Sequence, residues 1–246
     1  MRYIAKDAKA PLVIEAKLLV ATSATYDENP RVREIIRLIY GGCCAFCGST
    51  VEEGSYYQIE HFYPKGKAAY KSRDKDLENL HYCCTRCNFR KGRVLRDKIM
   101  SPNYFLDKSG NWQDTLPEKL EREIYYFGHM VYAHNYNPGP IDRGAETITL
   151  FNLNNTDPSG KSHRGYLVER RLRHYNLIYR QVQAVYNLLE WYHPSIDLAV
   201  NLLLENIMEY FREEHPWSVM VIHNFGDDVL KLLMIYDALK VKLATS

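Results

Sequence analysis

The chain has no long apolar run, no low-complexity segment and no strong charge of either sign. Its 246 residues carry 32 Lys and Arg against 30 Asp and Glu, which gives a formal net charge of +2. Bulk charge this close to neutral gives no argument for a nucleic-acid partner, so such an argument must come from local clusters. The N-terminal residues lack the layout of a signal peptide, and charges interrupt each apolar stretch well short of the ~18 residues that a membrane span needs. We therefore expect a cytoplasmic protein with no membrane association.

Cysteine is absent from most of the chain. All six cysteines lie between residues 43 and 87, in two tight clusters. The missing export signal indicates a reducing compartment, where clustered cysteines are metal ligands or free thiols rather than disulfides. Hydrophobic residues make up 46% of the sequence and charged residues 25%, as in an ordinary globular protein, and the length suits one large domain or two modest ones.

Two CxxC pairs, Cys44/Cys47 and Cys84/Cys87, have the number and spacing of ligands for one tetrahedral zinc ion. Gly48 follows the first pair and allows the backbone to fold back beneath the two sulfurs. Such a site closes a loop of about forty residues, so metal binding would contribute directly to folding. The sequence therefore predicts a structural zinc site.

Two points about these cysteines stay open at the level of sequence. A redox CxxC is the main alternative to zinc, because Cys84 could begin a helix as redox cysteines do. Two CxxC pairs around one compact unit disfavour that alternative. Cys43 and Cys83 each precede a pair, and either could replace one of its ligands.

A zinc ion with four sulfur ligands has no open position, so catalysis would need a second centre. Glu60 and His61 are adjacent at the end of a predicted strand, and their side chains therefore point in different directions. One can hold a metal while the other activates water, and His61 is a candidate general base. Asn88 begins the following helix and offers an amide oxygen, which together with a carboxylate suits Mg²⁺ or Mn²⁺.

The hydrophobic patterns predict an α+β protein that is mostly α. Around the cysteines we expect a strand at 56–61, a polar loop at 64–76, a second strand at 77–83 and a helix at 85–98. Before them, Pro11 can begin a short helix, and Pro30 begins a longer one that Asp27 or Asn29 can cap and Gly41-Gly42 ends. We expect a domain that carries the cysteines at 1–100, with its core at 43–98, a connecting segment at 101–160 and a helical region at 161–246.

The connecting segment is predicted to contain a small hairpin turning at Gly128 and a short helix at 145–151. The C-terminal region is predicted to form a helical bundle, with breaks at Pro194 and Pro216 and an interruption at Gly226. Its first helix repeats apolar residues at alternating spacings of four and three, namely Val168, Leu172, Tyr175, Tyr179, Val182, Tyr186 and Leu189.

Basic residues cluster around the predicted site. Between residues 65 and 98 there are eleven Lys or Arg against four acids. A basic loop and helix beside a metal would hold a phosphate backbone, although a solvated helix face is the plain alternative. The candidate nucleic-acid-binding residues are Lys65, Lys67, Arg86, Arg90 and Lys91.

The order CxxC, Glu-His, Asn and CxxCNxxKG over residues 43–92 resembles the HNH endonucleases, in their zinc-stapled ββα-metal branch. The resemblance implies a ββα-metal HNH core with structural zinc, flanked by an N-terminal helix and a C-terminal helical bundle. It implies that Glu60 and Asn88 hold the catalytic metal, His61 is the general base, and Asn79 holds the loop and orients that histidine. Many members have Asp where this chain has Glu60, and histidine where it has Asn88.

The blocks MRYI, CAFC, IEHFYPK, CNFRKG and ETITLFNLNN resemble a narrower bacterial HNH group. That group includes the nuclease subunit paired with an ATPase in Septu-type and some retron-linked anti-phage systems. The resemblance implies phosphodiester hydrolysis controlled by an SMC/ABC-like ATPase. It leaves open a hetero-complex with that ATPase or a homo-oligomer of this chain. DNA is the simpler target, and an RNA target such as tRNA stays open. The alternative is a non-catalytic zinc module that binds nucleic acid or protein.

Overall fold

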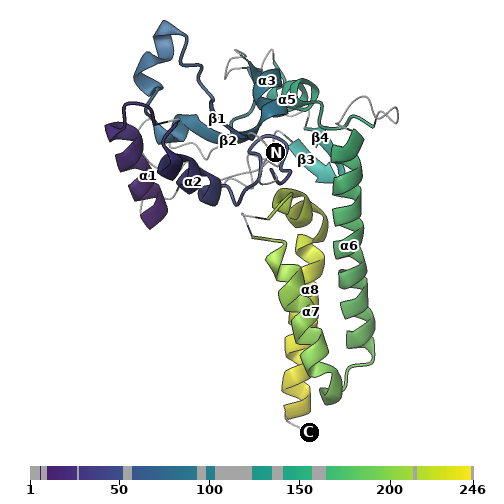
Figure 1. Cartoon of the computed structure of the whole chain (residues 1–246). Coiled ribbons are helices and arrows are strands. Elements are labelled where there is room, and N and C mark those ends of the chain that lie inside the picture. Colours follow the sequence, from purple (N-terminus) through teal and green to yellow (C-terminus); the bar gives the residue numbers. More distant parts are fainter. Residues whose placement is uncertain are drawn as a thin grey trace.

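The computed structural model describes residues 6, 10–26, 28–51, 57–92, 98–102, 124–134, 141–156, 165–212 and 215–244. Within these ranges the protein is mostly helical, with two antiparallel two-stranded sheets, which agrees with the predicted α+β class. Figure 1 shows the strands and the shorter helices gathered at one end, with the C-terminal helices projecting from them.

Two N-terminal helices pack on each other before the cysteines begin. Helix α1 spans Pro11–Thr22 and helix α2 spans Pro30–Ile39. Each has proline in its first turn, where the missing N–H has no partner to lose. The Asn29 side chain caps α2 by accepting from the backbone N–H groups of Arg31 and Val32, as the sequence predicts. The predicted stop after α2 is also confirmed, since Gly42 adopts a φ of +64°.

A strand–strand–helix unit follows. Strand β1, Tyr57–His61, pairs antiparallel with strand β2, Leu80–Cys84, and helix α3, Thr85–Lys91, continues directly from β2. The register places Glu60 opposite His81 and His61 opposite Leu80. The connection between the strands contains two 3-10 helices, Ala68–Arg73 and Leu77–Asn79.

Three sequence-based boundaries in this unit need correction. The segment expected as polar loop contains a 3-10 helix, and the second strand begins at Leu80 because residues 77–79 form a 3-10 turn that Asp76 caps. The helix expected to reach residue 98 ends at Lys91. Gly92 stops it with a φ of +48°, which side chains rarely adopt. Residues 93–97 lie outside the described part of the chain, as does residue 56.

The predicted hairpin and short helix are both present in the middle of the chain. Strands β3, Ile124–Phe127, and β4, Met130–Ala133, pair around Gly128, and helix α5 spans Arg143–Phe151. The remainder of the expected connecting segment, residues 103–123, 135–140 and 157–160, lies outside the described residues.

Three helices form the C-terminal arm: α6, Gly165–Glu190, α7, Asp197–Glu209, and α8, Ser218–Ala244, with a 3-10 turn at Pro194–Ile196. Figure 1 shows them running side by side away from the sheets, with the C-terminus at the far end. Gly226 does not interrupt α8, which corrects that expectation. None of the helices in the described ranges combines the length and the apolar character that a bilayer crossing requires.

The apolar face of α6 differs in part from the predicted stripe. Leu172 and Tyr179 are exposed, whereas Ile178 and Val185 are buried. The predicted stripe repeats every seven residues, whereas a straight helix has 3.6 residues per turn. The stripe therefore drifts around the helix, and the spacing alone does not decide between neighbouring faces. The choice between them is made by packing against α7 and α8.

The arm is joined to the rest of the protein by buried polar contacts. The Trp217 indole N–H, just before α8, donates to the backbone carbonyl of Cys47 at 3.1 Å. Arg171 of α6 is buried and donates to the carbonyl of Leu153, which follows α5. The apolar core continues through both parts, so the arm and the site region share one interior.

Candidate active site

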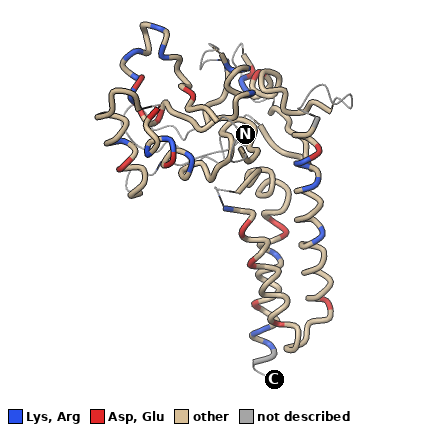
Figure 2. The backbone as a smooth tube through the Cα atoms, in the orientation of Figure 1, with Lys and Arg blue, Asp and Glu red and all other residues tan. Residues whose placement is uncertain are grey.

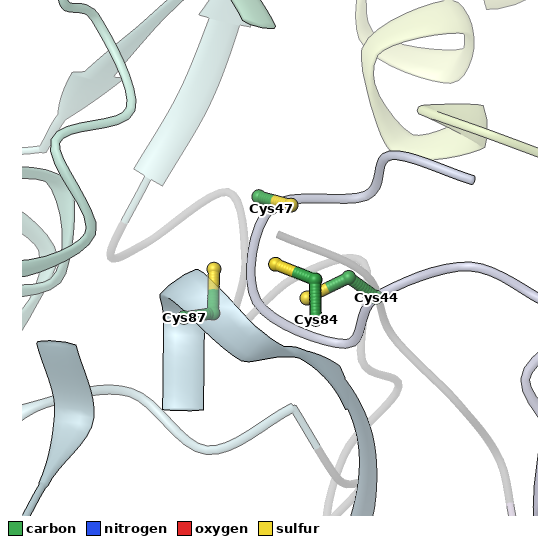
Figure 3. Close-up of side chains that lie close together, drawn as sticks. All are labelled: Cys44, Cys47, Cys84 and Cys87. Atoms are coloured by element: carbon green, nitrogen blue, oxygen red, sulfur yellow. The ribbon is translucent and has the colours of Figure 1, made fainter. Parts of the chain in front are cut away.

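Four cysteine sulfurs converge between the turn at residues 44–47 and the start of α3. The Sγ atoms of Cys44, Cys47, Cys84 and Cys87 all lie within 4.8 Å of one another, and Figure 3 shows the side chains gathered around one space. Zn–S bonds of 2.3 Å in a tetrahedron separate the sulfurs by about 3.8 Å, so the cluster fits a zinc ion with little adjustment. These four residues are the predicted ligands, and together they could hold a metal such as zinc.

The first CxxC is shaped by backbone contacts. The Gly48 N–H donates to the Cys44 carbonyl at 2.9 Å, and Gly48 adopts a φ of +74°, which favours glycine. The Ala45 N–H donates to the Tyr82 carbonyl at 2.9 Å, which fixes the turn to β2. Because β2 runs directly into α3, the two CxxC pairs are held on one frame.

The number of gathered sulfurs favours a metal site over a redox CxxC, because a redox pair needs only two. Burial raises the pKa of the Cys44 and Cys87 thiols well above the ordinary value. Of the two spare cysteines, Cys43 donates to the Gly41 carbonyl and Cys83 to the Cys84 carbonyl, and neither belongs to the four-sulfur cluster.

Asn79 clamps the loop that follows β1. Its side chain is fully buried; Oδ1 accepts from the Tyr63 N–H at 2.7 Å, and Nδ2 donates to the carbonyls of Tyr63 and Arg73. The Asn79 backbone carbonyl also accepts from the Phe62 N–H at 2.9 Å. These contacts hold the residues next to His61, although none of them is made to the imidazole itself.

His61 ends β1 and is buried, with 6% of its surface exposed. Its Nε2 lies 2.5 Å from the Tyr26 hydroxyl, 3.1 Å from the Asp74 carbonyl oxygen and 3.0 Å from an Asp74 carboxylate oxygen. Burial lowers the pKa of His61, and the contacts with Asp74 oppose that shift. The imidazole is therefore neutral near physiological pH, the form that a general base requires.

The partners of Nε2 fix which nitrogen carries the proton. A carbonyl and a carboxylate only accept hydrogen bonds, so a bare Nε2 lone pair facing both would be repelled. Nε2 therefore carries the proton, and the Tyr26 hydroxyl donates to Asp74, whose oxygens lie at 2.8 and 2.9 Å. Nδ1 is then the unprotonated nitrogen, and no described residue is hydrogen-bonded to it.

Glu60 forms a buried ion pair with Lys91. The Lys91 ammonium donates to Glu60 Oε1 at 2.6 Å and to the His61 carbonyl at 2.8 Å. The Lys91 side chain is 0% exposed and that of Glu60 is 14% exposed. Burial raises the pKa of Glu60, and the charge of Lys91 opposes the shift. The predicted contact between Lys91 and nucleic acid is therefore corrected, because a fully buried ammonium paired with a carboxylate is not a backbone-binding group.

Asn88 lies one turn before Lys91 on α3, so the two side chains share a helix face. It is half-buried, and its side chain makes no hydrogen bond to the described residues. Its amide oxygen and the second oxygen of Glu60 are hard ligands of the kind that Mg²⁺ and Mn²⁺ accept.

The other predicted nucleic-acid contacts lie at the surface. Lys65, Arg86 and Arg90 are exposed and Lys67 is half-exposed. Arg90 donates to the Leu150 carbonyl at 3.3 Å, so part of its guanidinium is used within the fold. Figure 2 shows the basic positions along the loop that connects β1 to β2.

Three residues of the site were missed by sequence reasoning. Tyr26 and Asp74 contact His61, but neither lies within ten residues of it, so no local pattern connects them. His81 is fully buried and lies opposite Glu60 in the sheet. Its Nδ1 is hydrogen-bonded to the Tyr40 hydroxyl at 2.6 Å, and its Nε2 has no hydrogen-bond partner among the described residues. Its burial lowers its pKa well below the ordinary value.

Comparisons of the whole chain with known proteins add no family assignment. No family model, no curated protein and no solved structure matches it. The functional argument therefore depends on the residues and their geometry.

Proposed function

We propose that the protein is a metal-dependent HNH endonuclease that hydrolyses phosphodiester bonds of nucleic acid, most simply DNA. The observation that carries the proposal is the placement of Glu60 and His61 at the end of a strand, directly beside a helix that starts in the four-cysteine cluster and presents Asn88. The cysteines make this unit rigid, and the acid, histidine and amide supply the chemistry.

In this reaction His61 takes a proton from the attacking water at Nδ1, because Nε2 is already engaged with Tyr26 and Asp74. Asn79 keeps the loop after His61 in place. A divalent cation held by Glu60 and Asn88 would stabilise the negative charge on the phosphate and on the departing oxygen. Lys65, Lys67 and Arg86 would contact the backbone phosphates on either side.

The decisive experiment incubates the purified protein with plasmid DNA and with total RNA, each with Mg²⁺ or Mn²⁺. We expect cleavage of DNA that requires the added metal, and His61→Ala should abolish it while the zinc content stays at that of the wild type. Cleavage of RNA alone would reassign the substrate. A zinc-containing protein that binds nucleic acid without cutting it would replace the proposal with a non-catalytic binding module.

We further propose that the nuclease is the effector subunit of an anti-phage system controlled by an SMC/ABC-like ATPase. An apolar strip on the outer side of α8 supports a protein partner, since Leu230, Met234 and Val241 recur at helical spacing and are 61%, 72% and 65% exposed. Co-expression with a candidate ATPase tests this. Met234→Glu should abolish co-purification, whereas the exposed Met208, on α7, changed to Glu serves as the matched control.

A further inference from the structure

The loop between α1 and α2 reaches into the catalytic cluster through one side chain. Tyr26 is 3% exposed, and its hydroxyl lies between the His61 imidazole and Asp74. Its ring also meets the imidazole edge-on, with centroids 6.1 Å apart. Tyr26 lies outside the segment that carries the acid, histidine, asparagines and cysteines, so that segment alone does not complete the surroundings of His61.

Other contacts hold this loop against the connection between β1 and β2. Lys75 donates to the Ser23 carbonyl at 2.9 Å, and the Asn29 amide donates to the Ser23 hydroxyl at 3.2 Å. Lys17 of α1 lies 3.8 Å from Glu78. The N-terminal helices are therefore attached to the same connection, between β1 and β2, that supplies Asp74.

We propose that Tyr26 is a positioning residue for His61. Asp74 sets the Nε2–H tautomer, and the Tyr26 hydroxyl fixes the orientation of the imidazole so that Nδ1 is directed to the reaction. The inference rests on the proposed nuclease function for its catalytic consequence. Nε2–H has three oxygen neighbours, one from Tyr26 and two from Asp74. The Tyr26 hydroxyl accepts a hydrogen bond from Nε2–H and donates one to Asp74, which keeps the Asp74 oxygens in place as acceptors. Without that hydroxyl, the ring loses its shortest contact and Asp74 loses its donor.

The test uses Tyr26→Phe, which removes one oxygen and keeps the ring. Tyr70→Phe is the matched control, because Tyr70 lies in the same connection, packs on Tyr63 with centroids 5.1 Å apart, and makes no side-chain hydrogen bond to the described residues. The ¹⁵N chemical shifts of the His61 ring, assigned by their loss in His61→Gln, report the tautomer directly. We expect all three proteins to show the Nε2–H form, because the Asp74 oxygens remain as acceptors. Only Tyr26→Phe should show a displaced and broadened Nε2 resonance, because the ring loses its shortest hydrogen bond.

The kinetic readout is independent of the spectroscopic one. General-base catalysis contributes about 10²–10⁴-fold, so loss of positioning should lower kcat for cleavage by roughly 10-fold in Tyr26→Phe while KM stays unchanged. Equal ring shifts and equal kcat in the two tyrosine variants would overturn the inference. If the wild type cuts no substrate, the nuclease proposal fails, and the ring shifts still decide whether Tyr26 positions the imidazole.

Discussion

The ion pair between Lys91 and Glu60 offers the sharpest test of the site geometry. Lys91→Met removes the ammonium and keeps a side chain of similar length in the same buried space. Breaking a buried pair by removing one partner costs about 3–5 kcal/mol, because the remaining charge is left uncompensated. Glu60 keeps 14% of its side-chain surface exposed, and we therefore expect the lower end, about 3 kcal/mol of lost unfolding free energy.

The pH dependence of this loss follows from Glu60. Burial raises its pKa already in the wild type, and the charge of Lys91 limits that rise. In Lys91→Met the pKa of Glu60 should rise further, so the carboxyl binds a proton in the folded state that it releases on unfolding. A raised carboxyl pKa gives stability that is present at low pH and is lost as pH rises through the folded-state pKa. The difference between variant and wild type should therefore be smaller at pH 6 than at pH 8.

Urea unfolding followed by far-UV circular dichroism, without added Mg²⁺ or Mn²⁺, measures this effect. The double variant Glu60→Gln/Lys91→Met removes both charges and should recover at least about 1.5 kcal/mol relative to Lys91→Met alone, as expected for coupled neighbours. Lys98→Met is the control at an exposed lysine. A Lys91→Met protein as stable as the control at pH 8 would contradict the buried pair.

Three further predictions concern the metal and the arm. We expect elemental analysis to find zinc in the wild type and none in Cys87→Ser, which should also unfold at a lower temperature, because structural zinc contributes folding energy. Trp217→Phe removes the donor to the Cys47 carbonyl and should cost about 1 kcal/mol and speed zinc loss to a chelator. Burial lowers the pKa of His223 to about 4, so the wild type should lose stability as pH falls below the unfolded-state value. His223→Asn keeps an acceptor for the Tyr126 N–H and should reduce that loss of stability by about 1 kcal/mol at pH 5. The full pKa shift corresponds to about 2 kcal/mol at this pH, and we halve it because solvent screens the partly exposed ring.

Local signals predicted the elements whose boundaries depend on nearby residues. Asn29 and Pro30 at the start of α2, Gly128 in the hairpin and the two CxxC pairs all act over a few residues, and each lies where it was expected. The spacing within each CxxC pair likewise predicted which four of the six cysteines cluster.

The residues that sequence reasoning misplaced depend on longer-range packing. Lys91 was assigned to the surface because it lies in a basic run, yet it is four residues after Cys87 and so shares its inward helix face. That spacing could have identified it as buried. Tyr26 could not be found in this way, because its contact with His61 spans 35 residues and depends on how the N-terminal helices pack on the connection between the strands.

Helix α3 connects the two centres, and its length determines how they depend on each other. Seven residues are too few for a helix that is stable alone in water, so α3 needs its contacts with the cysteine cluster and with the sheet. Cys84 is the N-cap residue just before the helix and Cys87 lies in its first turn, whereas Asn88 and Lys91 follow Cys87. Loss of zinc should therefore displace Asn88 and Lys91 and remove the proposed Mn²⁺ binding as well, whereas Glu60→Gln/Lys91→Met should leave zinc in place. We therefore expect the acid–histidine site to depend on the sulfur cluster more than the reverse, because Cys84 and Cys87 lie at the beginning of the helix.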